Sequence, residues 1–223
     1  MKRDVNHIIH NTSPWSPWNP TTGCTKVSPA CKNCYAEQTA LFLQRRSISA
    51  YSEGFTPRMH PSRLLIPSKL KKPKRIFVDA MSDLFHDAFD DGFIAEVFMA
   101  MVLAPQHTYF VLTKRPERMV ALASIIPAIP NLCIGVTVES NTYAHRSNAL
   151  RALPDHVIRF VNCEPLLANV TDLAFDAIDI VYASEEMGKF RRRPDPSWVI
   201  NLEATCAQNS VPFFSQRFDT RDP

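Results

Sequence analysis

Short runs of β-branched and aromatic residues alternate along this chain with longer segments whose apolar residues recur at helical spacing. The run RIFVDA is typical of a buried strand, and DDGFIAEVFMAMVLAP, which follows it, has the spacing of an amphipathic helix. The pattern predicts strands at 75–80, 108–114, 132–139, 157–165 and 177–184, with a final apolar run at 211–216. It predicts helices at 36–47, 90–105, 115–126, 141–153 and 196–210. A weaker first strand is expected at 16–23.

Strands that alternate with helices indicate right-handed crossovers and a parallel sheet. The strands are apolar almost without interruption, as expected for a sheet that is covered on both faces. Six or seven such units are too few for a complete eight-unit barrel. We therefore expect an α/β fold, a partial (βα)6-7 barrel with parallel strands, and an open doubly wound sheet is the alternative. Residues 1–223 are expected to form one domain, with an irregular, basic insertion at about 48–74.

Composition narrows the classes of function. The chain has 223 residues, of which 45% are hydrophobic, and this is enough for one sizeable core. Only five glycines are present and no glycine-rich phosphate loop is found. There is no apolar run long enough to span a membrane, and the first residues are too polar for a signal peptide. The sequence thus favours a cytoplasmic protein whose six cysteines stay reduced.

Polar side chains follow the predicted strands at the same edge of the sheet, which is where ligands bind in folds of this class. Glu139, Glu164 and Glu186 come after three successive strands. A packed core does not require charges at these positions, and helix capping explains only part of them. We therefore expect the carboxyl edge of the sheet to carry the functional site.

The segment GCTKVSPACKNCYAE, residues 23–37, contains three of the six cysteines, Cys24, Cys31 and Cys34. Three thiolates can hold three irons of a four-iron, four-sulfur cluster and leave the fourth iron open. A structural zinc ion would need a fourth ligand. The third alternative is that the thiols bind no metal, and the spacing of the cysteines alone does not decide among the three. The candidates for a fourth zinc ligand are His60, His86, Cys133 and Cys163.

The order of several motifs resembles a known family. The segments WNPTTGCTKVSPACKNCYAE, RIFVDAMSDLFHD, APQHTYFVLTKRPERM, LCIGVTVES, IRFVNCEPLL and VPFFSQRF are similar to those of a phage-type family of radical S-adenosylmethionine-like proteins of unknown function. The resemblance covers nearly the whole chain. It implies a 4Fe-4S cluster on the three cysteines, S-adenosyl-L-methionine on the open iron, and formation of a 5′-deoxyadenosyl radical.

The same resemblance implies roles for side chains near the predicted site. Cofactor-binding residues would be Tyr35, Ser82, Asp83, Thr113 and Glu186, and catalytic residues would be Lys114, Glu139 and Glu164. Helix capping, salt bridges and ordinary packing are the alternatives for these residues. The implied partners are a small-molecule or nucleotide substrate and an electron donor such as flavodoxin or ferredoxin. Nucleic acid is a further expected partner.

One segment departs from the family pattern. Relatives carry Gly-Gly-Glu-Ser-Gly after the sixth strand, whereas this chain has Ser184-Glu185-Glu186-Met187-Gly188. Loss of the two glycines narrows the approach of the backbone to a ligand. The run KFRRRP at 189–194 follows, and it is either a solvated loop or a contact to phosphate. The competing functional hypothesis is a zinc- or cluster-stabilised nucleic-acid-binding module without catalysis, for which the basic runs at 69–75 and 189–194 are the motive.

Overall fold

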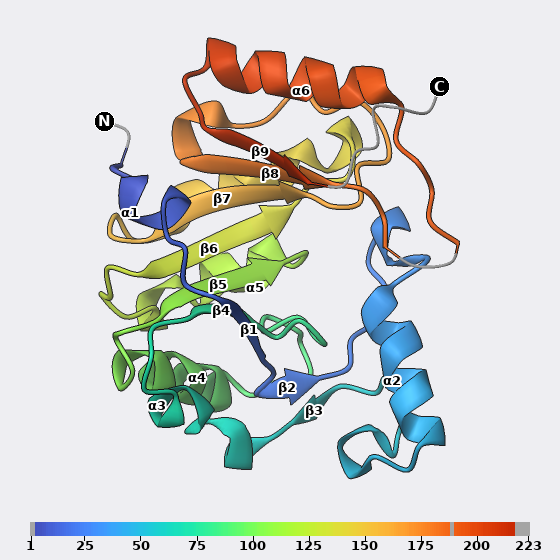
Figure 1. Ribbon diagram of the computed structural model, residues 1–223, viewed down its shortest axis with the longest axis vertical. Helices are drawn as coiled ribbons and strands as arrows, with labels where there is room; N and C mark the ends of the chain where they lie inside the picture. The colour runs from blue at the N-terminus through green and yellow to red at the C-terminus, as the bar shows by residue number, and fades with distance from the viewer. Residues whose placement is uncertain (1–2, 188–189, 217–223) are drawn as a thin grey trace.

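Seven parallel strands form the centre of the computed structural model, which describes residues 3–187 and 190–216. Along the sheet, the strands follow one another in chain order without reversal, and the sheet curls into a half-barrel (Figure 1). This order confirms the partial barrel and excludes the doubly wound alternative. The strands are β1 (Trp15–Trp18), β4 (Arg75–Val78), β5 (Thr108–Thr113), β6 (Leu132–Thr137), β7 (Ile158–Cys163), β8 (Ile180–Ser184) and β9 (Phe213–Gln216).

Helical segments connect the strands and cover the outer face of the sheet (Figure 1). They are α4 (Asp91–Val102), α5 (Pro116–Ala121), η4 (Ala123–Ile125), η5 (Asn141–Ala152), η6 (Phe175–Ala177) and α6 (Pro196–Gln208). The Asp90 carboxylate caps α4 by accepting from the Phe93 amide at 3.2 Å, and Asp195 caps α6 in the same way. Their apolar faces pack on Ile76, Val78 and other outward-facing strand residues to form the main core.

The segment at 141–152 is a 3-10 helix, where the sequence pattern predicts an ordinary helix. Asn141, the first residue of this segment, accepts from the Thr171 amide at 2.7 Å. The Arg146 side chain turns inward and donates to the carbonyl of Thr137 at 2.9 Å. Contacts of the side chains with distant backbone thus override the local helical preference.

An aromatic series covers the inner face of the sheet toward the amino ends of its strands. Ring centroids are separated by 4.8 Å from Trp15 to Phe110, by 6.0 Å from Phe110 to Phe160, and by 6.0 Å from Phe160 to Tyr182. The short helix α1 (Asn6–Ile9) packs against this layer. The inner face is therefore covered mainly by apolar side chains at one end, whereas the predicted site residues lie at its carboxyl end.

The insertion at 48–74 contains several short elements: η2 (Ser49–Tyr51), β3 (Arg58–Met59), η3 (Pro61–Arg63) and α3 (Ile66–Lys69). Strand β3 pairs antiparallel with β2 (Thr21–Thr22), which directly precedes the cysteine loop. Gly23 follows with a φ of 81°, and a Cβ there would lie 2.2 Å from the carbonyl oxygen of Thr56. Only glycine permits this crossing, so the insertion fixes where the cysteine loop begins.

Helix α2 (Tyr35–Arg45) follows the cysteine loop and stands beyond the carboxyl ends of the strands (Figure 1).

The predicted first strand at 16–23 is divided, because Asn19 and Pro20 separate β1 from β2. Among the described residues, no helix is both long and apolar enough to cross a lipid bilayer.

Candidate functional site

A cavity of about 430 Å³ opens at the carboxyl ends of the strands and contains the three cysteines of the loop. Cys24 follows β2, Cys31 ends the 3-10 helix η1 (Pro29–Cys31), and Cys34 immediately precedes α2. All three are free thiols and all three are partly exposed. The other predicted site residues on its wall are Tyr35, Ser82, Asp83, Thr113, Lys114, Glu164 and Glu186.

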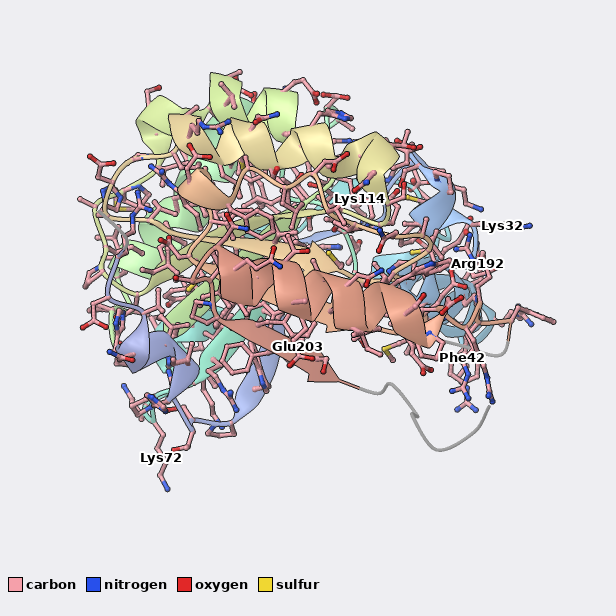
Figure 2. The ribbon with its side chains drawn as sticks, turned by 90° about the horizontal axis from the view of Figure 1, so that it is seen from above. Lys32, Phe42, Lys72, Lys114, Arg192 and Glu203 are labelled. Atoms are coloured by element: carbon pink, nitrogen blue, oxygen red, sulfur yellow. The ribbon has the colours of Figure 1, made fainter. Side chains whose placement is uncertain are left out.

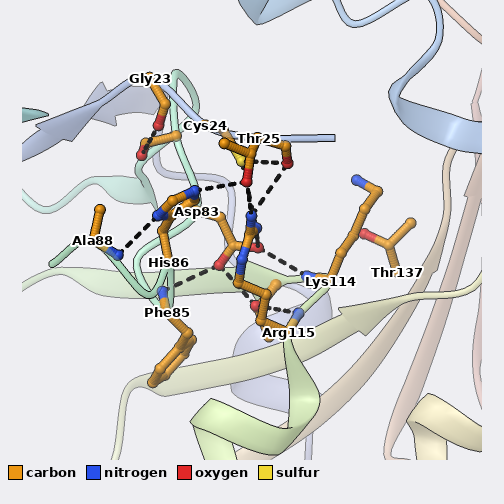
Figure 3. A network of polar contacts seen from close by, with 12 residues as sticks. Gly23, Cys24, Thr25, Asp83, Phe85, His86, Ala88, Lys114, Arg115 and Thr137 are labelled. Carbon is orange, nitrogen blue, oxygen red and sulfur yellow. Dashed lines mark hydrogen bonds and ion pairs between the residues drawn. The ribbon is translucent and has the colours of Figure 1, made fainter. Parts of the chain in front are cut away.

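Arg115 joins the cysteine loop to the sheet (Figure 3). Its guanidinium donates to the Cys24 Sγ at 3.4 Å and to Asp83 Oδ2 at 3.2 Å. The other terminal nitrogen donates to the carbonyl and hydroxyl oxygens of Thr25, at 3.1 and 2.9 Å. Since the Arg115 and Asp83 side chains are both 8% exposed, this is a buried ion pair that positions one of the three thiols.

Asp83 has its hydrogen-bonding capacity largely filled by the protein. Besides Arg115, it accepts from the Thr113 hydroxyl at 2.7 Å, from the Lys114 amide at 3.0 Å and from the Phe85 amide at 3.1 Å. Thr113 in turn accepts from the Arg115 amide at 2.9 Å. The structure thus brings Asp83 and Thr113 to the cavity wall, where their contacts hold the end of β5.

The environment of Cys24 controls its ionisation. Burial, and secondly the charge of Asp83, raise the pKa of this thiol to about 11, while Arg115 acts in the opposite direction. The metal-free thiol is therefore protonated at neutral pH. A metal ion or cluster would have to displace this proton to bind the thiolate.

Ser82 and Tyr35 line the cavity with hydroxyl groups that bond to the backbone. The Ser82 hydroxyl donates to the carbonyl of Gly23 at 2.6 Å, next to the start of the cysteine loop. The Tyr35 hydroxyl donates to the carbonyl of Ala80 at 2.5 Å. Burial raises the pKa of Tyr35 to about 12, so its phenol remains neutral.

Lys114 follows β5 and Glu164 follows β7, so the two residues line the cavity from either side of β6. Figure 3 shows the Lys114 side chain extending toward Thr137 on β6. Among residues 3–187 and 190–216, the Lys114 ammonium makes no ion pair. Asn162 donates to Glu164 Oε2 at 3.4 Å. A cation and a carboxylate therefore face the same space, and this arrangement suits a ligand that has both an anionic group and a hydrogen-bond donor.

Glu186 ties the segment after β8 to the cysteine loop. Its Oε2 accepts from Asn33 at 2.9 Å, and from the amide and Nε of Arg192 at 2.8 and 2.9 Å. Burial alone would raise the pKa of Glu186, but the bonds from Arg192 and Asn33 outweigh it and lower the pKa. Arg192 also donates to the carbonyl of Pro29 at 3.1 Å, and Figure 2 shows it on the same side of the molecule as Lys32.

Only parts of the two predicted functional runs near Glu186 lie within the described residues. Ser184 and Glu186 are buried at the end of β8, while Gly188 and Lys189 lie outside the described residues. Within the basic run, Arg192 is thus engaged with the protein, whereas Arg191 and Arg193 are exposed.

Glu139 is the one predicted catalytic residue that does not line the cysteine cavity. Its carboxylate is 1% exposed and accepts from Arg146 at 2.9 Å. It faces a second cavity of about 330 Å³, which Pro29 and Arg192 also line. Arg146 is seven residues further along the chain, in η5, and the sequence pattern did not single it out.

The residues present fit a cluster by the chemistry of their donors, since three reduced thiols from one loop line one cavity. In the part of the chain that is described, no three His, Cys, Asp or Glu side chains are close enough to hold a single metal ion. A cluster requires a wider arrangement than a single metal ion. Each thiolate binds its own iron, so the three cysteine sulfur atoms need not converge on one point.

The proposed fourth zinc ligands lie elsewhere or are engaged. Cys133 and Cys163 are buried within the sheet. His60 bonds to the Thr22 hydroxyl at 2.8 Å, and His86 bonds to the Thr25 hydroxyl at 2.9 Å. His86 Nδ1 also accepts from an amide, so its Nε2 carries the proton.

Arg115 and Asn33 are site residues that sequence reasoning missed. Arg115 directly follows Thr113 and Lys114, so its position at a strand end was the available signal. Asn33 lies between two of the cysteines, but its bond to Glu186 joins residues 153 positions apart. Asp79, at the end of β4, is another buried residue on the cavity wall that was not singled out.

A three-cysteine loop thus stands at the carboxyl edge of this parallel half-barrel. The chain is similar to the solved structure of spore photoproduct lyase complexed with dinucleoside spore photoproduct, with a TM-score of 0.54. The match covers 88% of this chain and 75% of that one at 10% identity, so it shows the fold alone. Among curated protein sequences none matches. The chain belongs to DUF5131, a family of proteins of unknown function, which it matches over residues 9–221.

Proposed function

We propose that this protein is a radical S-adenosylmethionine enzyme that holds a 4Fe-4S cluster through Cys24, Cys31 and Cys34. When bound, such a cluster supplies the electron that converts S-adenosyl-L-methionine to a 5′-deoxyadenosyl radical. The observation that carries the proposal is the convergence of three free thiols and several polar strand-end residues in one cavity at the carboxyl edge of the half-barrel. A purely structural metal site would not need that cavity.

The chain's own residues would bind, orient and enclose the reactants. Arg115 holds Cys24 in place, and Glu186 holds the loop that carries Cys31 and Cys34 through its bond to Asn33. Ser82, Asp83 and Thr113 fix the wall through hydrogen bonds to backbone and to each other. We propose that the predicted cofactor-binding residues shape the binding site through these hydrogen bonds. Tyr35 lines the cavity beside them.

Lys114 and Glu164 are the proposed contacts to the substrate or to the charged groups of the cofactor. The Lys114 ammonium suits a carboxylate or phosphate, and the Glu164 carboxylate suits an amino or hydroxyl group. We propose a small-molecule or nucleotide substrate, with modification of a nucleotide or a nucleic acid as the reaction class. Glu139, the third predicted catalytic residue, faces the second cavity.

The setting that we propose follows from the sequence resemblance. A phage-encoded enzyme of this kind would act in the host cytoplasm and would take its electron from a flavodoxin or ferredoxin.

Anaerobic reconstitution with iron and sulfide tests the proposal. The full chain should take up about four irons and show the broad visible absorption of a cluster. After reduction it should release 5′-deoxyadenosine from S-adenosyl-L-methionine. Cys31→Ala should lose both properties, whereas Cys206→Ala, which alters a buried thiol of α6 outside the cavity, should keep them.

The alternative function, a metal-stabilised nucleic-acid-binding module, predicts a different outcome. The exposed Arg191 and Arg193 are the observation in its favour. A folded protein that takes up one zinc ion per chain, binds DNA or RNA with a strong salt dependence and never cleaves the cofactor would replace the proposal with this alternative.

A further inference from the structure

A second cavity is lined in part by Pro29 of the cysteine loop, and its lining residues are all different from those of the first cavity. Its volume is about 330 Å³, at the small end of the range for ligand pockets. Glu139, Tyr143, Leu166, Arg193 and Trp198 are among the residues that line it. The wall toward the cysteine cavity includes Arg192, whose bonds to Glu186 were described above.

Glu139 lines this cavity and carries a buried acceptor that the protein does not satisfy. Its Oε2 is paired with Arg146 at 2.9 Å, whereas Oε1 has no hydrogen-bond partner among the described residues. A buried carboxylate oxygen without a donor is unfavourable, and native structures rarely leave one in this state. The cavity therefore suits a ligand that brings an N–H or O–H donor to Glu139.

The walls and the rim define the rest of that ligand. Tyr143 and Trp198 are aromatic and Leu166 is apolar, so the interior favours a flat ring. Arg193 lines the cavity, is exposed, and makes no ion pair within the described part of the chain. A guanidinium in this position suits a phosphate, which it can bind through two parallel hydrogen bonds.

We propose that the second cavity binds a nucleotide. Its base would donate an N–H to Glu139 Oε1 and lie against Trp198, and its phosphate would pair with Arg193. Free nucleotides and nucleotides within a strand share this chemistry. The site depends on neither the cluster nor S-adenosyl-L-methionine, so it stands apart from the proposed catalytic function.

Titration calorimetry on the full chain tests the site with AMP, GMP, CMP and UMP as probes. At least one monophosphate should bind saturably, with one molecule per chain, and the matching nucleoside should bind about tenfold more weakly because it lacks the phosphate. Arg193→Ala should reduce monophosphate affinity to that of the nucleoside. Arg191→Ala removes an exposed arginine of the same run and is the matched control, which should bind normally.

Two further variants test the base contacts. Glu139→Gln should weaken binding about ten- to hundredfold, because a charge-assisted bond is replaced by a neutral one. Trp198→Ala, which leaves the Glu139–Arg146 pair intact, should weaken it at least about fivefold, and it serves if Glu139→Gln fails to fold. Saturable binding of no monophosphate, or binding that is indifferent to both Arg193→Ala and Trp198→Ala, would overturn the proposal.

Two additions to the same experiment answer separate questions. The first asks whether the ligand is a free nucleotide or part of a strand, and the second tests the nucleotide site separately from the proposed catalytic function. If a tetranucleotide binds more tightly than the monophosphate, the natural ligand is part of a strand. If it binds equally or more weakly, the ligand is a free nucleotide. Both results require that the monophosphate binds at this site. Cys31→Ala should bind the monophosphate like the unaltered chain. Loss of binding in this folded variant would contradict a site that does not depend on the cluster.

Discussion

Replacing Asp79 with asparagine should stabilise this protein at neutral pH. Asp79 ends β4, is 3% exposed and accepts from the Thr21 amide at 2.9 Å, while its second oxygen has no partner among the described residues. Burial raises the pKa of this carboxyl from 3.8 to about 8, with a smaller contribution from Asp83. The folded protein therefore keeps a proton at pH 7 that the unfolded chain has released.

The sign and size of the effect follow from proton linkage. Between pH 3.8 and about 8, unfolding releases the Asp79 proton. The contribution of Asp79 therefore makes the free energy of unfolding greatest in acid and lowers it as pH rises. Each pH unit in this window costs about 1.4 kcal/mol. The cost at pH 7 is thus on the order of 4 kcal/mol, as an upper bound. Asparagine has the donor and acceptor of a protonated carboxyl and tolerates the φ of 55° at this position.

Urea unfolding of both proteins from pH 4 to pH 8 measures this contribution. Asp79→Asn should gain progressively on the unaltered chain as pH rises, by up to about 4 kcal/mol at pH 7, and the gain should vanish near pH 4. Asp155→Asn changes a fully exposed aspartate and should show no such pH-dependent gain. An Asp79→Asn protein that is less stable than the original at pH 7, or whose difference does not vary with pH, would refute the reasoning.

Two substitutions test the buried contacts that position the site. Arg115→Ala leaves Asp83 buried without its ion-pair partner and should lower the free energy of unfolding by about 3 kcal/mol in urea titration; Arg115→Lys should lose less, and equal losses would argue against the charge. Gly135→Ala places a Cβ 2.5 Å from the Phe160 carbonyl oxygen and should cost about 1–3 kcal/mol or more in the same assay. Adding Phe160→Leu should not restore stability, since that oxygen remains; full recovery would show that only the ring was in the way.

The hydrophobic pattern was sufficient for the strands but not for their arrangement. Runs such as 108–114 and 132–139 correspond closely to β5 and β6. In a doubly wound sheet the strand order reverses and helices cover both faces, whereas a half-barrel keeps its strands in chain order. The periodicity of one strand or helix does not encode that order. The structure resolves the choice because its helices cover one face and its strands stay in chain order.

Which residues share a cavity was predictable for residues that follow strand ends, and less so where the arrangement depends on contacts between residues far apart in the sequence. Lys114, Glu164 and the three cysteines meet in one cavity, as residues at one edge of a parallel sheet should. Glu139 has the same sequence context, yet its carboxylate is buried in an ion pair with Arg146, and the residue lines the second cavity. An ion pair that forms only when η5 folds back is not visible in strand periodicity.

The Glu186–Arg192 pair gives the two cavities a common thermodynamic boundary. Glu186 lines one cavity and Arg192 lines the other, so a ligand that strengthens or loosens their bond on one side changes the free energy of binding on the other. Such coupling is reciprocal: whatever factor a nucleotide applies to the affinity for a ligand at the cysteines, that ligand must apply to the nucleotide. The affinity measured at one cavity, first with the other cavity empty and then with it filled, therefore gives the coupling free energy in both directions.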